Sequence, residues 1–247
     1  MMGRFSCTST AKSPKFLKVN LMKIKLFILS LGLVGTMAYA NTCAEIYHID
    51  PQSAIGICQK ELTQNPDNAQ LQFYLGFAYH ATQDYQKSFE WFTKSANLGE
   101  MHAQNNLGMM YRHGEGVAQD YGKAYELFTK SAKQGFDGAE YNLGTMYYFG
   151  RGVKQDEARA FEWFGKSANQ GVADAQFALG MMYYLKQDYT NALEWFGKSA
   201  EQEVAHAQTH LAMMYDNGYG APKNPDTAKY WFARACDNGY DVACYYL

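Results

Sequence analysis

The stretch LGMMYRHGEGVAQDYGKAYELFTKSAKQG, residues 107–135, is followed by LGTMYYFGRGVKQDEARAFEWFGKSANQG at residues 143–171. The two copies begin 36 residues apart in a chain of 247 residues. Self-similarity at such a period is typical of repeat architectures, in which each copy is one supersecondary unit. The number of copies and the structure of one copy therefore decide the fold.

Two markers locate the copies. The first is the glycine of a Leu-Gly pair (alanine in the last copy), and the second is the small residue that ends each Lys-Ser-Ala motif or its counterpart. The first marker stands at Gly76, Gly108, Gly144, Gly180 and Ala212, and the second at Ala96, Ala132, Ala168, Ala200 and Cys236. The distance from a second marker to the next first marker is always 12 residues, whereas within a copy it is 20 or 24 residues. All the length variation therefore falls in one place, which we interpret as a loop.

Each copy has the period of two helices. In one copy Ala103, Leu107 and Met110 share a helical face in the first half, and Ala124 and Phe128 share one in the second half. An Asp or Asn precedes the second half, where a side-chain oxygen caps free backbone N–H groups. A glycine follows the second half in most copies, as expected at a helix C-terminus. The sequence predicts about five helix pairs.

The loop inside each pair has two lengths. The longer form reads HGEGVAQD, FGRGVKQD or NGYGAPKN, and the forms HATQD and LKQD are four residues shorter. The Gly-x-Gly of the longer form suits a wider turn because glycine adopts backbone angles barred to other residues. It does not indicate a phosphate site, because the third glycine, a P-loop lysine and a preceding strand are all missing. After the second helix of the fourth copy, Glu203 replaces glycine, and we expect a less regular turn there.

The pattern A-x-x-x-L-G-x-M-Y-x-x-G-x-G-V-x-x-D, followed by K-A-x-x-x-F-x-K-S-A-x-x-G, resembles the Sel-1-like repeat, a relative of the tetratricopeptide repeat. The resemblance covers about residues 69–247, and the copies at 103–135 and 139–171 match it fully. It implies an all-α fold, a right-handed superhelical solenoid of antiparallel helix pairs. It also implies a role as a non-enzymatic interaction scaffold.

The first 40 residues have the pattern of an export signal. Lys23 and Lys25 precede an apolar stretch that ends in the cleavage-type sequence Ala38-Tyr39-Ala40. We expect the signal proper to span residues 22–40 and the protein to be periplasmic or secreted; whether the chain starts at Met1 or Met22 stays open. The apolar stretch is too short for a stable membrane span, and no later run reaches eighteen apolar residues.

Removal of residues 1–40 changes the charge. That segment holds six of the 22 basic residues and none of the 24 acidic ones, so 16 − 24 leaves a net charge near −8. An acidic surface disfavours nucleic acid or an anionic membrane as the partner, and favours a neutral or basic protein or peptide. We expect residues 41–68 to form an N-terminal helical cap and residues 69–247 to form the repeat array.

Four cysteines follow the predicted signal. In an exported chain they favour two disulfides, and pairing by neighbourhood gives Cys43–Cys58 and Cys236–Cys244. The alternative is a four-thiolate metal site, although no C-x-x-C pair is present. The spacing of the last two cysteines resembles that of the cysteine-rich secreted branch of the family.

That branch raises an enzyme hypothesis, because some members are linked to penicillin binding or β-lactam hydrolysis. Such chemistry needs Ser-x-x-Lys, and the one instance, Ser9 to Lys12, lies in the segment expected to be removed. His206 and His210 could share a helical face, but no third metal ligand is evident. We predict no catalytic residue, metal or cofactor. A glycan-binding role would need exposed tryptophans, and we expect the four present to lie in the core: Trp91, Trp163, Trp195 and Trp231.

Solenoids bind partners along the surface made by successive first helices. The face of these helices that points away from the core of the pair is rich in aromatic residues and methionine, where a free-standing helix would be polar. The candidate partner-binding residues are Phe73, Phe77, Met109, Arg112, Tyr141, Tyr148, Phe177, Met181, Tyr184 and Met213. The same side chains could instead pack against the next pair, and we expect Tyr148 and Tyr184, at the helix ends, to be the most exposed.

Overall fold

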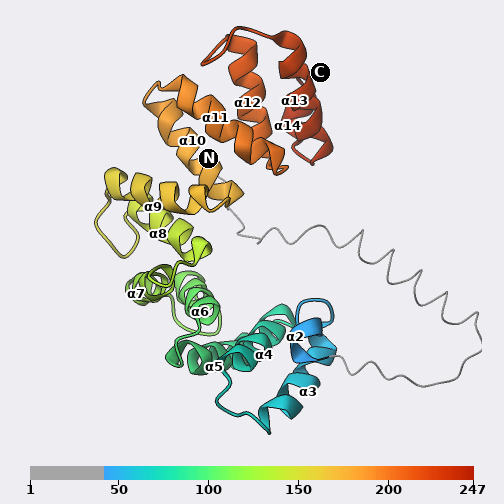
Figure 1. Cartoon of the computed structure of the whole chain (residues 1–247), viewed down its shortest axis with the longest axis vertical. Helices are drawn as coiled ribbons and strands as arrows, with labels where there is room; N and C mark the ends of the chain where they lie inside the picture. Colours follow the sequence, from blue (N-terminus) through green and yellow to red (C-terminus); the bar gives the residue numbers. More distant parts are fainter. Residues whose placement is uncertain (1–41) are drawn as a thin grey trace, which may run out of the picture. The chain divides into compact units, whose positions relative to one another are not determined.

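The computed structural model describes residues 42–247, and these residues form one compact unit. The predicted signal segment, residues 1–40, lies outside the described residues. Every regular element of the described part is a helix, and the helices follow one another as packed pairs (Figure 1). The prediction of an all-α solenoid is confirmed.

Within residues 42–247 there are five helix pairs, flanked by short terminal helices. The first helices are α4 (Ala69–Ala81), α6 (Met101–His113), α8 (Asp137–Phe149), α10 (Ala173–Leu185) and α12 (Ala205–Asn217). The second helices are α5 (Tyr85–Asn97), α7 (Tyr121–Ala132), α9 (Glu157–Asn169), α11 (Tyr189–Glu201) and α13 (Pro225–Asp237). The N-terminal helices are α2 (Cys43–Ile46) and α3 (Pro51–Leu62), and the chain ends with the single turn α14 (Asp241–Cys244).

The boundaries of the second helices follow from their capping residues. Asp156, for example, accepts a hydrogen bond from the backbone N–H of Arg159, and the matching Asp or Asn does the same in the other four pairs. The expectation of a less regular turn at Glu203 is wrong. Glu203 adopts a φ of 66°, the left-handed conformation of its glycine counterparts, and its N–H bonds to the carbonyl of Ala200 at 3.0 Å, as Gly171 bonds to Ala168.

The two helices of a pair touch at the glycine of the Leu-Gly motif. A Cβ atom built at Gly144 would lie 2.6 Å from Cδ1 of Phe164, and the other three marker glycines face a phenylalanine equally closely. The serine of the Lys-Ser motif adds a polar tie: Ser167 Oγ donates to the carbonyl of Asp137, at the start of the first helix, at 2.8 Å. The glycine is therefore required for close packing and not for its backbone angles.

The long loops bind the pair that precedes them. The second glycine of each long loop packs against the first residue of the second helix in the preceding pair. A Cβ atom added to this glycine would come within 2.3 to 2.5 Å of that residue's carbonyl oxygen. The contacts are Gly116 on Tyr85, Gly152 on Tyr121 and Gly220 on Tyr189. The preceding helix begins with tyrosine in all three cases, whereas α9, which comes before the short loop of the fourth pair, begins with Glu157.

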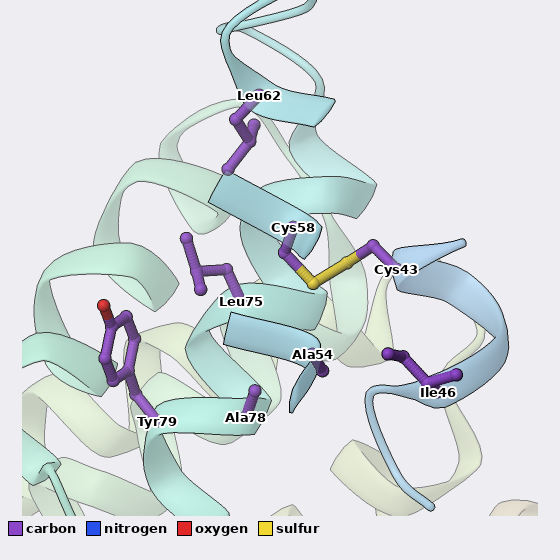
Figure 2. Close-up of a cluster of buried hydrophobic side chains, with 8 residues drawn as sticks. All are labelled: Cys43, Ile46, Ala54, Cys58, Leu62, Leu75, Ala78 and Tyr79. Carbon is purple, nitrogen blue, oxygen red and sulfur yellow. A yellow bond between two sulfur atoms is a disulfide. The ribbon is translucent and has the colours of Figure 1, made fainter. Parts of the chain in front are cut away.

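Both terminal segments are tied by disulfides, as predicted. Cys43 and Cys58 join α2 to α3, and Cys236 and Cys244 join α13 to α14. Figure 2 shows the first bridge inside a cluster of buried apolar side chains from α2, α3 and α4, among them Leu62 and Leu75. Because this cluster continues into the first pair, α2 and α3 close the N-terminal end of the array.

Candidate functional site

Eight of the ten predicted partner-binding residues are half-buried on successive first helices. They are Phe77 on α4, Met109 on α6, Tyr141 and Tyr148 on α8, Phe177, Met181 and Tyr184 on α10, and Met213 on α12. We call these eight the first-helix face. Each side chain is in partial contact with the neighbouring elements and keeps part of its surface in solvent, so the face is a row of anchored apolar groups.

Phe73 and Arg112, by contrast, are buried, with 6% and 8% of their surface exposed. Phe73 stacks on Phe92 of its own pair, with ring centroids 5.9 Å apart. Arg112 Nη1 donates to Asn142 Oδ1 of the next first helix at 3.0 Å. Both side chains point into the packing within and between pairs, and neither can serve as a contact for a partner, which corrects their inclusion in the predicted site.

Tyr148 and Tyr184 have neighbours at the helix ends. The Tyr148 ring meets Phe149 edge-on at 5.0 Å, and the Tyr184 ring meets Tyr189 at 5.4 Å. Tyr219, from the long loop of the fifth pair, stacks on Tyr189 at 4.6 Å. The aromatic cluster of α10 and α11 therefore extends onto the next pair.

The most exposed apolar side chains of the first helices are ones that the sequence analysis missed. Phe149 is 44% exposed and Leu185 is 64% exposed, and they follow Tyr148 and Tyr184 as the last residues of α8 and α10. Their position at the end of a helix could have indicated this exposure, because the last residue of a helix has no following turn to cover it. The matching residues in the other three pairs are Ala81, His113 and Asn217, so the exposed apolar ends occur in the middle of the array.

The pKa values of three titratable groups on the first helices are shifted in different directions. The hydrogen bond that the His102 ring donates to the Glu100 carboxylate raises the pKa of His102. Burial raises the pKa of Asp174, an effect that the nearby His206 opposes. Burial lowers the pKa of His210, whose Nδ1 is 2.8 Å from the carbonyl oxygen of His206 and whose ring packs on Phe177. Of the two histidines that the sequence analysis considered as metal ligands, His210 therefore has its ring packed against an aromatic side chain.

Nothing in residues 42–247 brings three or more His, Cys, Asp or Glu side chains together as a metal site. In the same part of the chain, no helix has the length and apolar character needed to cross a bilayer. What the first-helix face offers a ligand is aromatic and thioether contact area, the kind of surface that carries much of the binding energy at protein interfaces.

The four tryptophans are half-buried and pack against the core clusters, as partly exposed members of the packed stripe. Each lies on a second helix with a cation from the next turn over its ring; Lys94 Nζ, for example, is 4.0 Å from the centroid of the Trp91 ring. Lys166, Lys198 and Arg234 cover the other three rings at 4.1 to 5.6 Å. These rings are in cation–π contacts and are not open platforms for a sugar.

Comparisons with known proteins agree with this architecture. The family model described as the Sel1 repeat matches residues 69–100, 102–136, 138–172, 173–204 and 205–240. A comparison with curated proteins found no match. Among solved structures, the chain is similar to c5321, described as a protective antigen present in uropathogenic Escherichia coli strains, with 30% identity, a TM-score of 0.72, and coverage of 78% of this chain and 43% of that one.

A Sel1 repeat protein from Oxalobacter formigenes is similar as well, with 31% identity, a TM-score of 0.71, and coverage of 78% of this chain and 57% of the other. A further structure, from Klebsiella pneumoniae, has 24% identity, a TM-score of 0.50 and coverage of 75% and 94%, and it supports the fold alone. The chain therefore spans about half the length of the two most similar of these three proteins.

Proposed function

We propose that this chain, which belongs to the Sel1 repeat family, is an exported scaffold that binds a protein or peptide along its first-helix face. Sel1 repeats and the related tetratricopeptide repeats commonly act as non-catalytic interaction scaffolds. The observation that carries the proposal is the row of half-buried aromatic and methionine side chains, together with the exposed Phe149 and Leu185 that follow Tyr148 and Tyr184 in the sequence.

Export is supported by two independent features. The predicted signal at residues 22–40 is one. The other is the pair of disulfides, which persist in oxidising compartments such as the periplasm and the extracellular space. A chain without residues 1–40 carries an excess of acidic groups, and we propose that the partner is neutral or basic.

The test compares two triple variants of the purified protein in affinity capture from the envelope and medium fractions of the source cells. The face variant is Tyr148→Ala/Met181→Ala/Tyr184→Ala. The control variant, Lys130→Ala/Glu162→Ala/Tyr230→Ala, changes exposed residues of second helices. All six side chains are at least partly exposed, so both variants are expected to fold, and circular dichroism checks this.

A partner that is retained by the parent and the control, and lost by the face variant, supports the proposal. Retention by all three proteins would place binding elsewhere on the array. Equal loss from both variants would show that the loss of binding is not specific to the first-helix face and would contradict the proposal.

A further inference from the structure

A buried hydrogen-bond acceptor recurs in every helix pair, four residues before the marker position of the first helix. In the last four pairs it is the side-chain oxygen of Gln104, Glu140, Gln176 or Gln208. A carboxamide from the loop after the second helix donates to it in each case, at 2.8 to 3.0 Å. The donors are Gln134, Gln170, Gln202 and Asn238.

The same carboxamide also reaches back to the preceding pair. Gln134 Nε2, for example, donates to the carbonyl of Gly99 at 3.0 Å as well as to Gln104. The other three donors make the corresponding contact at 2.9 to 3.5 Å. One primary amide, with its two N–H groups, thus satisfies a buried side-chain acceptor and a backbone acceptor.

The first pair departs from this pattern. Gln72 is the acceptor, and Leu98 stands where the other pairs have Gln or Asn. Gln72 is only 4% exposed, and its Nε2 donates to the carbonyl of Pro66 at 2.7 Å. Its Oε1 is buried and has no hydrogen-bond partner among the described residues. A buried acceptor left without a partner costs about 1–3 kcal/mol, so this position has an unmet requirement for a donor.

Gln72 also lines a cavity of about 430 Å³. The wall is mostly apolar, with Leu62, Trp91 and Leu98 among its residues, and Asp67 and Lys94 add polar groups. Leu62 belongs to the N-terminal core drawn in Figure 2, so one wall is fixed by the disulfide-tied cap. Leu98 is 51% exposed, so about half of its surface is in solvent. Pockets of this size and apolar character are typical of ligand sites with a few polar groups.

We propose that this cavity is a binding site for a peptide segment that carries a Gln or Asn side chain next to an apolar residue. The carboxamide enters beside Leu98 and donates one N–H to Gln72 Oε1, as Gln134 does to Gln104 in the second pair. The apolar neighbour packs on the Trp91 and Leu62 wall. The site shares no residue with the first-helix face, and the proposal does not depend on that face.

The pattern of the other four pairs favours a carboxamide as the donor. A carboxylate has no proton to donate to Gln72 Oε1, and an aliphatic group would leave the acceptor unsatisfied. A backbone acceptor is also available at the equivalent position. In the second pair this acceptor is the carbonyl of Gly99, five residues before Gln104. In the first pair, Asp67 lies five residues before Gln72 and lines the cavity. The Asp67 carbonyl is therefore the counterpart of the backbone acceptor used in the other pairs.

The experiment titrates the protein with the capped dipeptide N-acetyl-Leu-Gln-methylamide and follows the Trp91 indole N–H and the Gln72 side-chain NH₂ by NMR. The analogues with Glu or Ala in place of Gln are the ligand controls. We expect saturable shifts of both signals with the Gln peptide, and affinities lower by about tenfold or more with the Glu and Ala peptides, in line with the loss of a buried hydrogen bond.

Two variants complete the test. Leu98→Gln restores the internal donor of the other pairs and should abolish the response to the peptide while raising the melting temperature. Leu98→Ala opens the cavity without adding a donor and should retain binding. Equal binding by the Leu98→Gln variant, equal affinity for the Glu peptide, or peptide-induced shifts confined to other parts of the array would each overturn the proposal. Loss of binding in Leu98→Ala, with the fold intact, would do the same.

Discussion

Replacing Gly144 and Gly165 by alanine should have opposite effects on stability, although both residues lie inside helices. Alanine is favoured over glycine in a helix by about 1 kcal/mol, so propensity alone predicts the same gain twice. At Gly165 a Cβ would meet nothing within 4 Å. Gly165→Ala should therefore raise the free energy of unfolding by about 0.5–1 kcal/mol.

At Gly144 the new Cβ would lie 2.6, 2.8 and 3.0 Å from three carbons of the Phe164 ring. That ring is 4% exposed and has little room to move. Overpacking of this kind costs about 1–3 kcal/mol, which exceeds the propensity gain of at most about 1 kcal/mol. Gly144→Ala should leave the protein less stable than Gly165→Ala by about 1–3 kcal/mol.

Thermal unfolding followed by circular dichroism measures the difference, because one kcal/mol shifts the melting temperature by about 2–4 °C in a chain of this size. The double variant Gly144→Ala/Phe164→Leu should recover part of the loss by making room for the added methyl group. Ala212 provides a natural comparison: it occupies the same marker position and belongs to the same buried cluster as Phe232, whose ring stacks on Tyr246. Equal stabilisation by the two single substitutions would refute the reasoning.

Three further changes test other features of the array. Glu140→Gln should stabilise the protein at neutral pH by about 1 kcal/mol. Burial raises the pKa of the Glu140 carboxyl, and the other four pairs have an uncharged glutamine at this position. Since the folded-state pKa is the higher one, the wild-type penalty is present above it and vanishes as pH falls below the ordinary value of 4.5, so denaturant titrations at several pH values should show the gain shrinking with acid. Glu203→Gly should raise the melting temperature, because glycine adopts the left-handed φ at a cost lower by about 1 kcal/mol and the exposed ion pair to Arg234 contributes little; an unchanged or lower melting temperature would contradict this. Cys43→Ser/Cys58→Ser should cost about 3 kcal/mol for opening a loop with a sequence separation of 15, measured by urea unfolding of the parent under oxidising conditions against the variant.

The repeat spacing was sufficient to predict the fold. The constant distance of 12 residues between markers reflects the fixed packing of one pair on the next, and the variation of four residues falls in the loops between the two helices of a pair. Both disulfides could be predicted for a related reason, since each joins cysteines that are close in sequence at an end of the array.

The candidate site could be predicted only in part. Helical periodicity assigns a residue to a face of its own helix, but whether that face is covered depends on the next helix pair. Phe73 and Arg112 were placed on the open face for this reason, and the structure buries both. Glu203 shows the same limit for turns: the surrounding helices impose the left-handed angle, and the side chain tolerates it.

The contact between each long loop and the tyrosine before it makes the order of the repeats part of the design. A pair with a long loop needs a predecessor whose second helix starts with a backbone that accepts the loop glycine, and in this chain such a predecessor always starts with tyrosine. The third pair, whose second helix starts with Glu157, is followed by a pair with a short loop. Exchanging the fourth and fifth pairs would place the long loop of the fifth pair after the helix that starts with Glu157, a combination that does not occur in this chain, whereas the short loop of the fourth pair has no glycine to place. The contact therefore constrains the order of these two repeats on one side.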